Sequence, residues 1–365
     1  MADMIITPAA RSLVPQIWDA ELFSEYVRSN RFMRYMGTDA GAMIQVKKDL
    51  TRKRGDTITF AARRKLVGAG VTGDTLLEGA EEVLDTHGMK LTVQPIRHAV
   101  AVTDWQEQQS VVDLRSAARD ALKDWAMEKM RTDIISSFLS LNGAPIATSS
   151  AANSNAWLAA NFDRVLFGGA RSNNTGVFST SLANVGPATT VPGKMGKAVI
   201  SLAKRLAKTA KPTIRPITVK GDQEWYVAFM PSLAFRDLQA DPAIQTTYQY
   251  AADRGKDNIL FTDDDIVIAG VICREIPEMP ILTGVGAGGG DVAPWVLCGA
   301  QALGVAWAQT LQSTTNERDY KFRHGVGISE IRGIGKLAFG RTPGAETNLV
   351  DQGMLTGFVS GVADG

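Results

Sequence analysis

The chain has 365 residues, of which 45% are hydrophobic and 21% charged, and its formal net charge at pH 7 is +1. A chain of this length can bury a large core, and we expect it to divide into two or three sub-domains. The near-neutral balance argues against a dedicated, strongly basic nucleic-acid-binding surface. No apolar run reaches the roughly 18 residues of a membrane span, so no membrane partner is expected.

Residues 1–54 are predicted to form an arm that gains much of its order from contacts elsewhere. One short helix is expected at about residues 15–26, where apolar side chains recur at helical spacing: Ile17, Trp18, Leu22, Phe23 and Tyr26. The start of the chain lacks the basic-then-apolar pattern of a secretory signal, so we do not expect secretion.

Residues 55–102 carry the most informative pattern of the chain. Alternating runs at 57–60 and 89–93 predict two strands. The connection between them is long, with glycines at 68, 70, 73, 79 and 88. Long connections in compact domains usually serve a function, such as a lid, a binding loop or an arm onto a neighbour. We therefore predict an extended loop here.

Charged residues flank this connection on both sides. Basic residues precede it and acidic residues follow it, so that one ribbon holds both halves of a charge-complementary contact. A subunit that joins many copies of itself needs such a contact. The predicted inter-subunit residues are Arg63, Arg64, Lys65, Glu78, Glu81 and Glu82.

The longest helical pattern begins at Asp104. Asp104 and Glu107 predict a capping box, and apolar residues then recur at threes and fours until Asn142-Gly143 supplies a stop. One helix over 104–141 would be about 55 Å long. Residues 143–192 follow without a sustained period and are interpreted as a surface insertion.

The segment 190–310 is predicted to form a sheet flanked by helices. Helices are expected at 192–210 and 231–239, and strands at 214–219, 224–229, 266–273 and 295–298. The helix expected at 192–210 has four cations, which are Lys197, Lys204, Arg205 and Lys208. We interpret them as a solvated helix face and not as a DNA contact. A further alternating stretch runs from Tyr320 to Phe339, and residues from Arg341 onward are interpreted as a loosely held tail.

Catalytic motifs receive little support. Gly68, Gly70 and Gly73 match the spacing of a dinucleotide-binding turn, but that turn needs a buried strand before it and a helix after it. The same spacing at 284–289 is followed by Pro294, which opposes an immediate helix. We therefore predict no catalytic residues and no cofactor.

Metal-binding patterns are equally weak. The histidines His87, His98 and His324 share no metal-ligand spacing. Asp263, Asp264 and Asp265 lack the distal glutamate of a calcium loop and predict a solvated turn. Cys273 and Cys298 lie in apolar runs and are expected to be buried, reduced thiols. No metal site is predicted.

Several segments, in this order, resemble tailed-phage major capsid proteins of the phage N-four type. They are GDTITF (55–60), GAGVTGDTLLEGAEE (68–82), RHAVAV (97–102), the positions Leu114, Arg115, Leu122 and Trp125, CGAQAL (298–303) and GIGKLAF (333–339). Each is weak alone, whereas the ordered set is fairly specific. Residues 143–192 and the tail after Arg341 lie outside the resemblance.

The resemblance implies an α+β fold, the capsid fold that tailed phages share with herpesviruses and that is named after a Hong Kong coliphage. Its parts would be an N-terminal arm (1–54), an extended loop (55–102), a peripheral domain with a spine helix and an insertion (103–190), an axial domain (191–310), returning peripheral strands (311–340) and a C-terminal tail (341–365).

The resemblance also implies a function, which is association and not catalysis. Pentamers and hexamers would close an icosahedral shell around double-stranded DNA, held by non-specific contact. Assembly would occur in the host bacterial cytoplasm with a portal and with scaffolding or decoration proteins, and the product would be part of the virion. Two alternatives stay open: the shell of an encapsulin-like nanocompartment and, more distantly, a nucleotide-dependent soluble enzyme.

Overall fold

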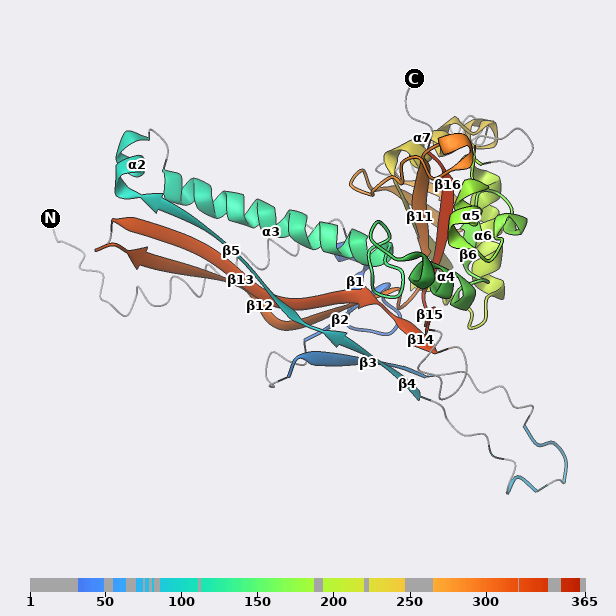
Figure 1. Ribbon diagram of the computed structural model, residues 1–365. Coiled ribbons are helices and arrows are strands. Elements are labelled where there is room, and N and C mark those ends of the chain that lie inside the picture. Colours follow the sequence, from blue (N-terminus) through green and yellow to red (C-terminus); the bar gives the residue numbers. More distant parts are fainter. Residues whose placement is uncertain are drawn as a thin grey trace. The chain divides into compact units, whose positions relative to one another are not determined.

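The computed structural model describes residues 32–48, 55–63, 70–74, 76–78, 81, 86–110, 113–186, 193–219, 223–246, 265–320, 322–340 and 349–361. The chain divides into two units, each assembled from separate segments (Figure 1). The first unit takes residues from 1–58, 91–137 and 304–335, and the second from 59–90, 138–303 and 336–365. The helix predicted at 15–26 lies outside the described residues.

The first unit is built on a five-stranded sheet. Its strand order is β1 (Met36–Gly37), β2 (Ile44–Lys47), β12 (Leu303–Arg318), β13 (Arg323–Lys336) and β5 (Gln94–Thr103). A short 3-10 helix, η1 (Met33–Tyr35), precedes β1. The antiparallel pairing of β5 and β13 is continuous from Thr103 opposite Arg323 to Gln94 opposite Arg332. The residues 326, 328, 330 and 332 of β13 are all buried, as expected when alternate residues share one face of a strand.

The helix predicted over 104–141 is broken in the structure. It consists of α2 (Asp104–Gln109) and α3 (Leu114–Phe138). The capping box belongs to Thr103 and Gln106: the Gln106 N–H donates to Thr103 Oγ1 at 3.3 Å, and the Thr103 N–H donates to Gln106 Oε1 at 3.2 Å. Asp113 caps the second helix, because its Oδ1 accepts from the N–H groups of Arg115 and Ser116.

The helix α3 nevertheless has the predicted apolar stripe. Leu122, Ala126, Met130 and Ile134 follow one another at intervals of four and are at most 1% exposed. The 25 residues of α3 are about 37 Å long at 1.5 Å per residue. The chain turns after the helix at Asn142 and Gly143, whose φ angles are 47° and 83°.

The second unit is built on a seven-stranded sheet. Its order is β6 (Val165–Phe167), β16 (Met354–Ser360), β11 (Val292–Cys298), β8 (Gln223–Met230), β10 (Val271–Glu275) and β9 (Ile266–Ile268), with β7 (Ile217–Val219) also paired to β8. The strand predicted at 266–273 is a hairpin of β9 and β10, because Ala269 and Gly270 turn the chain with φ angles of 49° and 79°.

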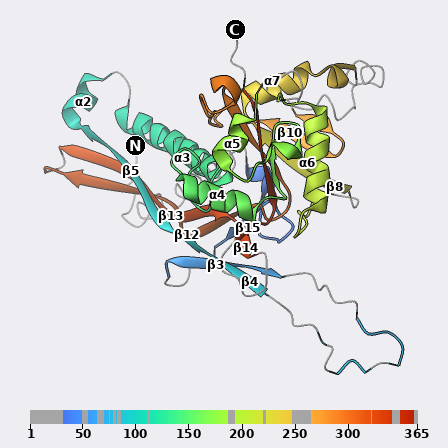
Figure 2. The ribbon, with the colours of Figure 1, turned by 45° about the vertical axis from the view of Figure 1, so that its right-hand side comes forward.

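Helices cover both faces of this sheet (Figure 2). The predicted helices α6 (Lys197–Thr209) and α7 (Ser232–Ala240) pack with Leu166, Trp295 and Leu355. On the other face, α4 (Ala151–Ala160) and α5 (Phe178–Ala183) pack with Phe167 and Phe358. The strands are therefore buried on both sides, which explains their continuous apolar runs.

Two predictions about this unit were wrong. Residues 143–192 are not a surface insertion, since their described part supplies Trp157, Leu158 and β6 to the core. The residues after Arg341 are not a loose tail, because β16 lies between β6 and β11 with all seven residues buried. A Cβ on Gly357 would lie 2.3 Å from the Trp295 indole, so the strand needs a glycine that weakens its sequence pattern.

The remaining strands pair locally. β3 (Thr57–Arg63) pairs with β4 (Thr86–Thr92), and β14 (Ala338–Gly340) pairs with β15 (Leu349–Asp351). The described residues also include the 3-10 turns η3 (Arg171–Asn173) and η5 (Ala287–Gly289). Tyr320 was predicted within an alternating stretch, but it lies in the turn between β12 and β13. Within these described ranges, no helix is both long and apolar enough to cross a membrane.

Candidate inter-subunit site

The predicted contact residues lie at the end of β3 and along the chain that leads from it to β4. Arg63 is the last residue of β3, and Glu78 and Glu81 are exposed. Arg64, Lys65 and Glu82 lie outside the described residues. The structure therefore places two of the acidic residues on the surface.

The same loop exposes two leucines that the sequence analysis did not single out. The exposed fractions of Leu76 and Leu77 are 73% and 59%. Large exposed apolar side chains side by side are a common sign of a contact surface. The signal was present in the sequence as an apolar pair in a glycine-rich loop without periodicity, next to Glu78.

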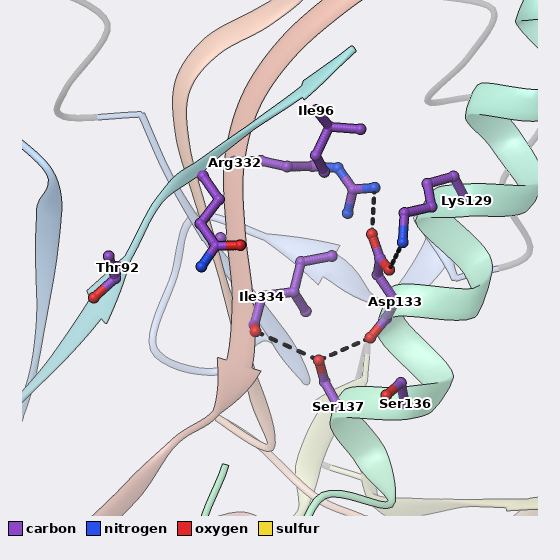
Figure 3. Close-up of a pocket in the computed structure, with 10 residues that line it drawn as sticks. Thr92, Ile96, Lys129, Asp133, Ser136, Ser137, Arg332 and Ile334 are labelled. Carbon is purple, nitrogen blue, oxygen red and sulfur yellow. Dashed lines mark hydrogen bonds and ion pairs between the residues drawn. The ribbon is translucent and has the colours of Figure 1, made fainter. Parts of the chain in front are cut away.

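In the first unit, a charged network holds α3 against β13 (Figure 3). The Arg332 side chain is 1% exposed, and its guanidinium contacts Glu330 at 2.6 Å and Asp133 at 2.7 Å. Lys129 pairs with the second oxygen of Asp133 at 2.8 Å. Two carboxylates thus balance two cations, and the buried arginine has no uncompensated charge.

A pocket of about 330 Å³ adjoins this network. Its lining comes from α3, β13, the end of β4 and the start of β5, and includes Thr92, Gln94, Ile96, Ser136, Ser137 and Ile334. The Ser137 hydroxyl donates to the Asp133 carbonyl at 2.8 Å and approaches the Ile334 carbonyl at 3.4 Å. Because the acids and bases at the pocket pair with one another, the arrangement positions α3 on β13.

The second unit has its own buried polar network around Asp351. One carboxylate oxygen of Asp351 accepts from Lys336 Nζ at 3.0 Å and from Trp157 Nε1 at 3.2 Å. The Asp351 N–H donates to Asn161 Oδ1 at 3.0 Å. Arg164, 1% exposed, donates to the carbonyls of Asp351 and Pro212. The network ties the C-terminal strands to α4 and β6.

The weak cofactor and metal motifs can be placed in part. Gly284, Gly286 and Gly289 lead into the three-residue η5 and then into β11 at Val292, so the helix that a dinucleotide turn requires does not follow them. Gly68 lies outside the described residues. In the described ranges, no three or more His, Cys, Asp or Glu residues gather in a way that could hold a metal ion.

The cysteines are buried thiols, as predicted. Cys273 and Cys298 are 0% exposed and form no disulfide. Burial raises the pKa of both thiols, with Asp265 adding to the effect at Cys273 and Lys336 opposing it at Cys298. Both thiols are therefore held neutral and away from solvent.

A family model for phage capsid proteins matches residues 7–357. The chain belongs to the phage capsid protein family. It is a major capsid protein of a tailed phage and forms the capsid shell, with the α+β fold that the resemblance implied. A capsid protein is a structural protein and a part of the virion.

This capsid protein is 28% identical over 345 residues to the major capsid protein of Pseudomonas phage KPP25, which covers 88% of this chain and 89% of that protein. The cyanophage Pam1 capsid asymmetric unit is 34% identical, with a TM-score of 0.81 over 93% of this chain and 94% of that chain. The capsid of Ralstonia phage GP4, 23% identical, shares the fold with a TM-score of 0.72 over 92% of each chain.

These relatives favour the phage shell over the alternatives. All three are phage capsid proteins, so neither the nanocompartment shell nor the nucleotide-dependent enzyme gains support from them.

In the capsid protein, two cations of α6 have local partners: Lys204 donates to the Ala269 carbonyl, and Lys208 lies 3.5 Å from Glu224. These contacts agree with a solvated helix face.

Proposed function

We propose that this capsid protein assembles through pentamers and hexamers into an icosahedral shell around double-stranded DNA, and that the loop of residues 61–88 makes the contact between neighbours within each ring. The observation that supports the loop contact is the exposure of its apolar residues. Leu76, Leu77 and Glu78 are exposed together in the described part of the loop, and a neighbouring subunit could cover the two leucines.

The two kinds of side chain would have different tasks. An exposed ion pair contributes only about 0–1 kcal/mol, whereas buried apolar surface contributes roughly 25 cal/mol per Å². Leu76 and Leu77 would therefore supply adhesion on the neighbour. Arg63, Arg64, Lys65, Glu78, Glu81 and Glu82 would select the register and the partner, because like charges oppose every wrong alignment.

Glycines in the loop suit a contact that must serve rings of two sizes. Gly70 and Gly73 have φ angles of 69° and 76°, a region that other residues rarely adopt. Closed rings of five and six place neighbours at different angles, so the connecting segment must adapt. The family implies the rings, and these glycines support the loop as the adaptable element.

Charge reversal tests the loop directly. We expect the triple variant Arg63→Glu, Arg64→Glu, Lys65→Glu to stay folded but to form few or no rings and shells under conditions in which the wild type assembles. A second variant that also carries Glu78→Lys, Glu81→Lys and Glu82→Lys should regain assembly, since the loop then holds the same pairs inverted. Negative-stain microscopy and sedimentation report the outcome.

The control reverses three cations of α6, through Lys197→Glu, Arg205→Glu and Lys208→Glu. It changes the net charge by the same amount and should assemble normally. Normal shells from the loop variant would sink the proposal, as would an equal loss in the control.

The proposal also includes partners and a location. The shell would join a portal, would use scaffolding or decoration proteins, and would assemble in the host bacterial cytoplasm. The protein would act by association and would catalyse no reaction. Contact with DNA would be non-specific, consistent with the net charge of +1. Nuclease-protected DNA in purified particles is the expected finding, and particles that hold enzymes instead would support a nanocompartment.

A further inference from the structure

One stretch of the second unit is basic throughout. From Arg164 to Gly221 the sequence contains no aspartate or glutamate, although the net charge of the whole chain is only +1. The near-neutral total therefore conceals a region in which positive charge is concentrated. The helix α6 and the segments beside it contain most of these cations, which are Lys194, Lys197, Lys204, Arg205, Lys208 and Lys211.

The cations of α6 lie on one side of the helix. Positions 197, 201, 204, 205 and 208 recur at intervals of three and four, and such positions are neighbours on a helix surface. The other side of α6 is apolar and buried, and includes Val199, Ala203 and Leu206. We name the surface formed by Lys197, Ser201, Lys204, Arg205 and Lys208 the cationic face.

Groups near the cationic face neutralise little of its charge. Lys204 donates to a backbone carbonyl, which has no net charge. Lys208 lies 3.5 Å from Glu224, but both side chains are more than half exposed, so water screens the pair. In the part of the chain that the structure describes, neither Lys197 nor Arg205 has an ion-pair partner. Most of the positive charge is therefore available to an external anion.

The composition of the cationic face indicates the class of its partner. A protein interface usually has an apolar centre and is depleted in lysine, whereas this face consists of three lysines, one arginine and one serine. Cations and hydroxyl groups of this kind bind the phosphate oxygens of DNA, and such contacts need no apolar centre. The face thus fits a polyanion better than it fits the surface of another protein.

The length of the cationic face also suits a phosphate backbone. Lys197 and Lys208 are eleven residues apart, which corresponds to about 16 Å along the helix axis. One strand of a DNA duplex presents a phosphate about every 3.4 Å along its axis, and so offers about five over this distance. Several cations of one helix can therefore contact the same strand together.

We propose that the cationic face of α6 is a surface on which this capsid protein contacts the phosphate backbone of the enclosed double-stranded DNA. The inference rests on the proposed shell around DNA and revises the interpretation of these cations from the sequence. The face is solvated in the single subunit, and it would meet DNA in the filled shell. Because phosphate contacts carry no sequence information, it would bind DNA of any sequence.

The variant Lys197→Gln, Arg205→Gln, Lys208→Gln tests the cationic face in solution. These side chains are exposed and glutamine is a good helix former, so the melting temperature should be kept. Fluorescence anisotropy measures the affinity of the unassembled subunit for a labelled DNA duplex between about 50 and 200 mM salt. We expect the affinity at the lower salt to fall by about tenfold or more. The slope of log affinity against log salt should decrease by about two to three, because each lost phosphate contact removes about one.

The matched control removes the same charge from three exposed arginines of the first unit, through Arg97→Gln, Arg119→Gln and Arg318→Gln. These residues lie on β5, α3 and β12, and the control should keep the affinity and the salt slope of the wild type. A wild-type slope in the α6 variant would overturn the inference. An equal loss in the control would also overturn it, because binding would then follow net charge alone.

Lysine acetylation tests the cationic face after assembly. Lys197 and Lys208 should be protected in DNA-filled shells and reactive in empty shells of the same chain, as mass spectrometry of the digested particles would show. Protection in both kinds of shell would assign the face to a neighbouring subunit or another protein, and reactivity in both would show that DNA does not cover it. Either result contradicts the inference.

Failure of this inference and failure of the proposed function are distinguishable. Closed shells with nuclease-protected DNA but with fully reactive Lys197 and Lys208 would defeat the DNA contact at α6 and leave the proposed shell intact. Shells that never hold DNA would defeat the proposed function and this inference with it.

Discussion

At the residue scale, Asp351 shows how the second unit depends on a buried charge. Its side chain is 7% exposed and that of Lys336 is 6% exposed. Asp351→Asn would leave the buried ammonium group without its counter-charge, which typically costs about 3–5 kcal/mol. We expect the free energy of unfolding of the unassembled subunit to fall by that amount in urea titrations.

Asp319→Asn is the matched control for Asp351→Asn. Asp319 is 60% exposed and lies 4.0 Å from Arg323, so its replacement should cost less than about 1 kcal/mol. Equal unfolding midpoints for the two variants would show that the Asp351 network contributes little to stability.

The buried thiols predict how stability changes with pH. Burial raises the pKa of Cys273 and Cys298 above the ordinary value of 9.0. Above pH 9, unfolded chains lose these two protons while folded chains keep them, so the free energy of unfolding falls as the pH rises. Each thiol should contribute a slope of about 1.4 kcal/mol per pH unit.

The double variant Cys273→Ala, Cys298→Ala isolates this effect. Above pH 9.0, its free energy of unfolding should decline less steeply with rising pH than that of the wild type. Lysines and tyrosines titrate in both proteins and cancel in the comparison. Equal slopes of the free energy of unfolding against pH in the two proteins would mean that the thiols do not cause the loss of stability at alkaline pH.

At the element scale, removal of a carboxylate from the network between α3 and β13 should cost more stability where that carboxylate is more deeply buried. Glu330 and Asp133 both contact Arg332, but their side chains are 3% and 25% exposed. Glu330→Gln should destabilise the subunit by about 3 kcal/mol, because the pair is fully desolvated. Asp133→Asn should cost about 1 kcal/mol, since water screens its carboxylate. Calorimetry should show the larger fall in Tm for Glu330→Gln.

Elements whose side chains follow one period were predictable from the sequence. The stripe of α6 includes Val199 and Leu206, and α3 repeats an apolar residue every four positions. The break between α2 and α3 was missed because Asp113, a capping residue, stands within a run that otherwise has helical spacing. The role of β16 was hidden by Gly357, which the Trp295 indole requires.

The candidate site was predictable only in part. The basic residues before the loop and the acidic residues after it predicted a contact there, with residues such as Arg63 and Glu78. It carried no information on exposure, so Leu76 and Leu77 were overlooked.

At the scale of the whole molecule, we propose that the capsid protein joins its copies through the loop between β3 and β4. The loop combines leucines with clustered charges, so apolar burial and charge selection act at the same place. Because the loop is proposed to build the rings, loop variants should accumulate single subunits.

Electron cryomicroscopy of closed wild-type shells tests the central claim most directly. The account predicts that Leu76, Leu77 and Glu78 of each subunit lie buried against the adjacent subunit of the same pentamer or hexamer. A map in which these three residues contact only their own subunit, or remain in solvent, would contradict it.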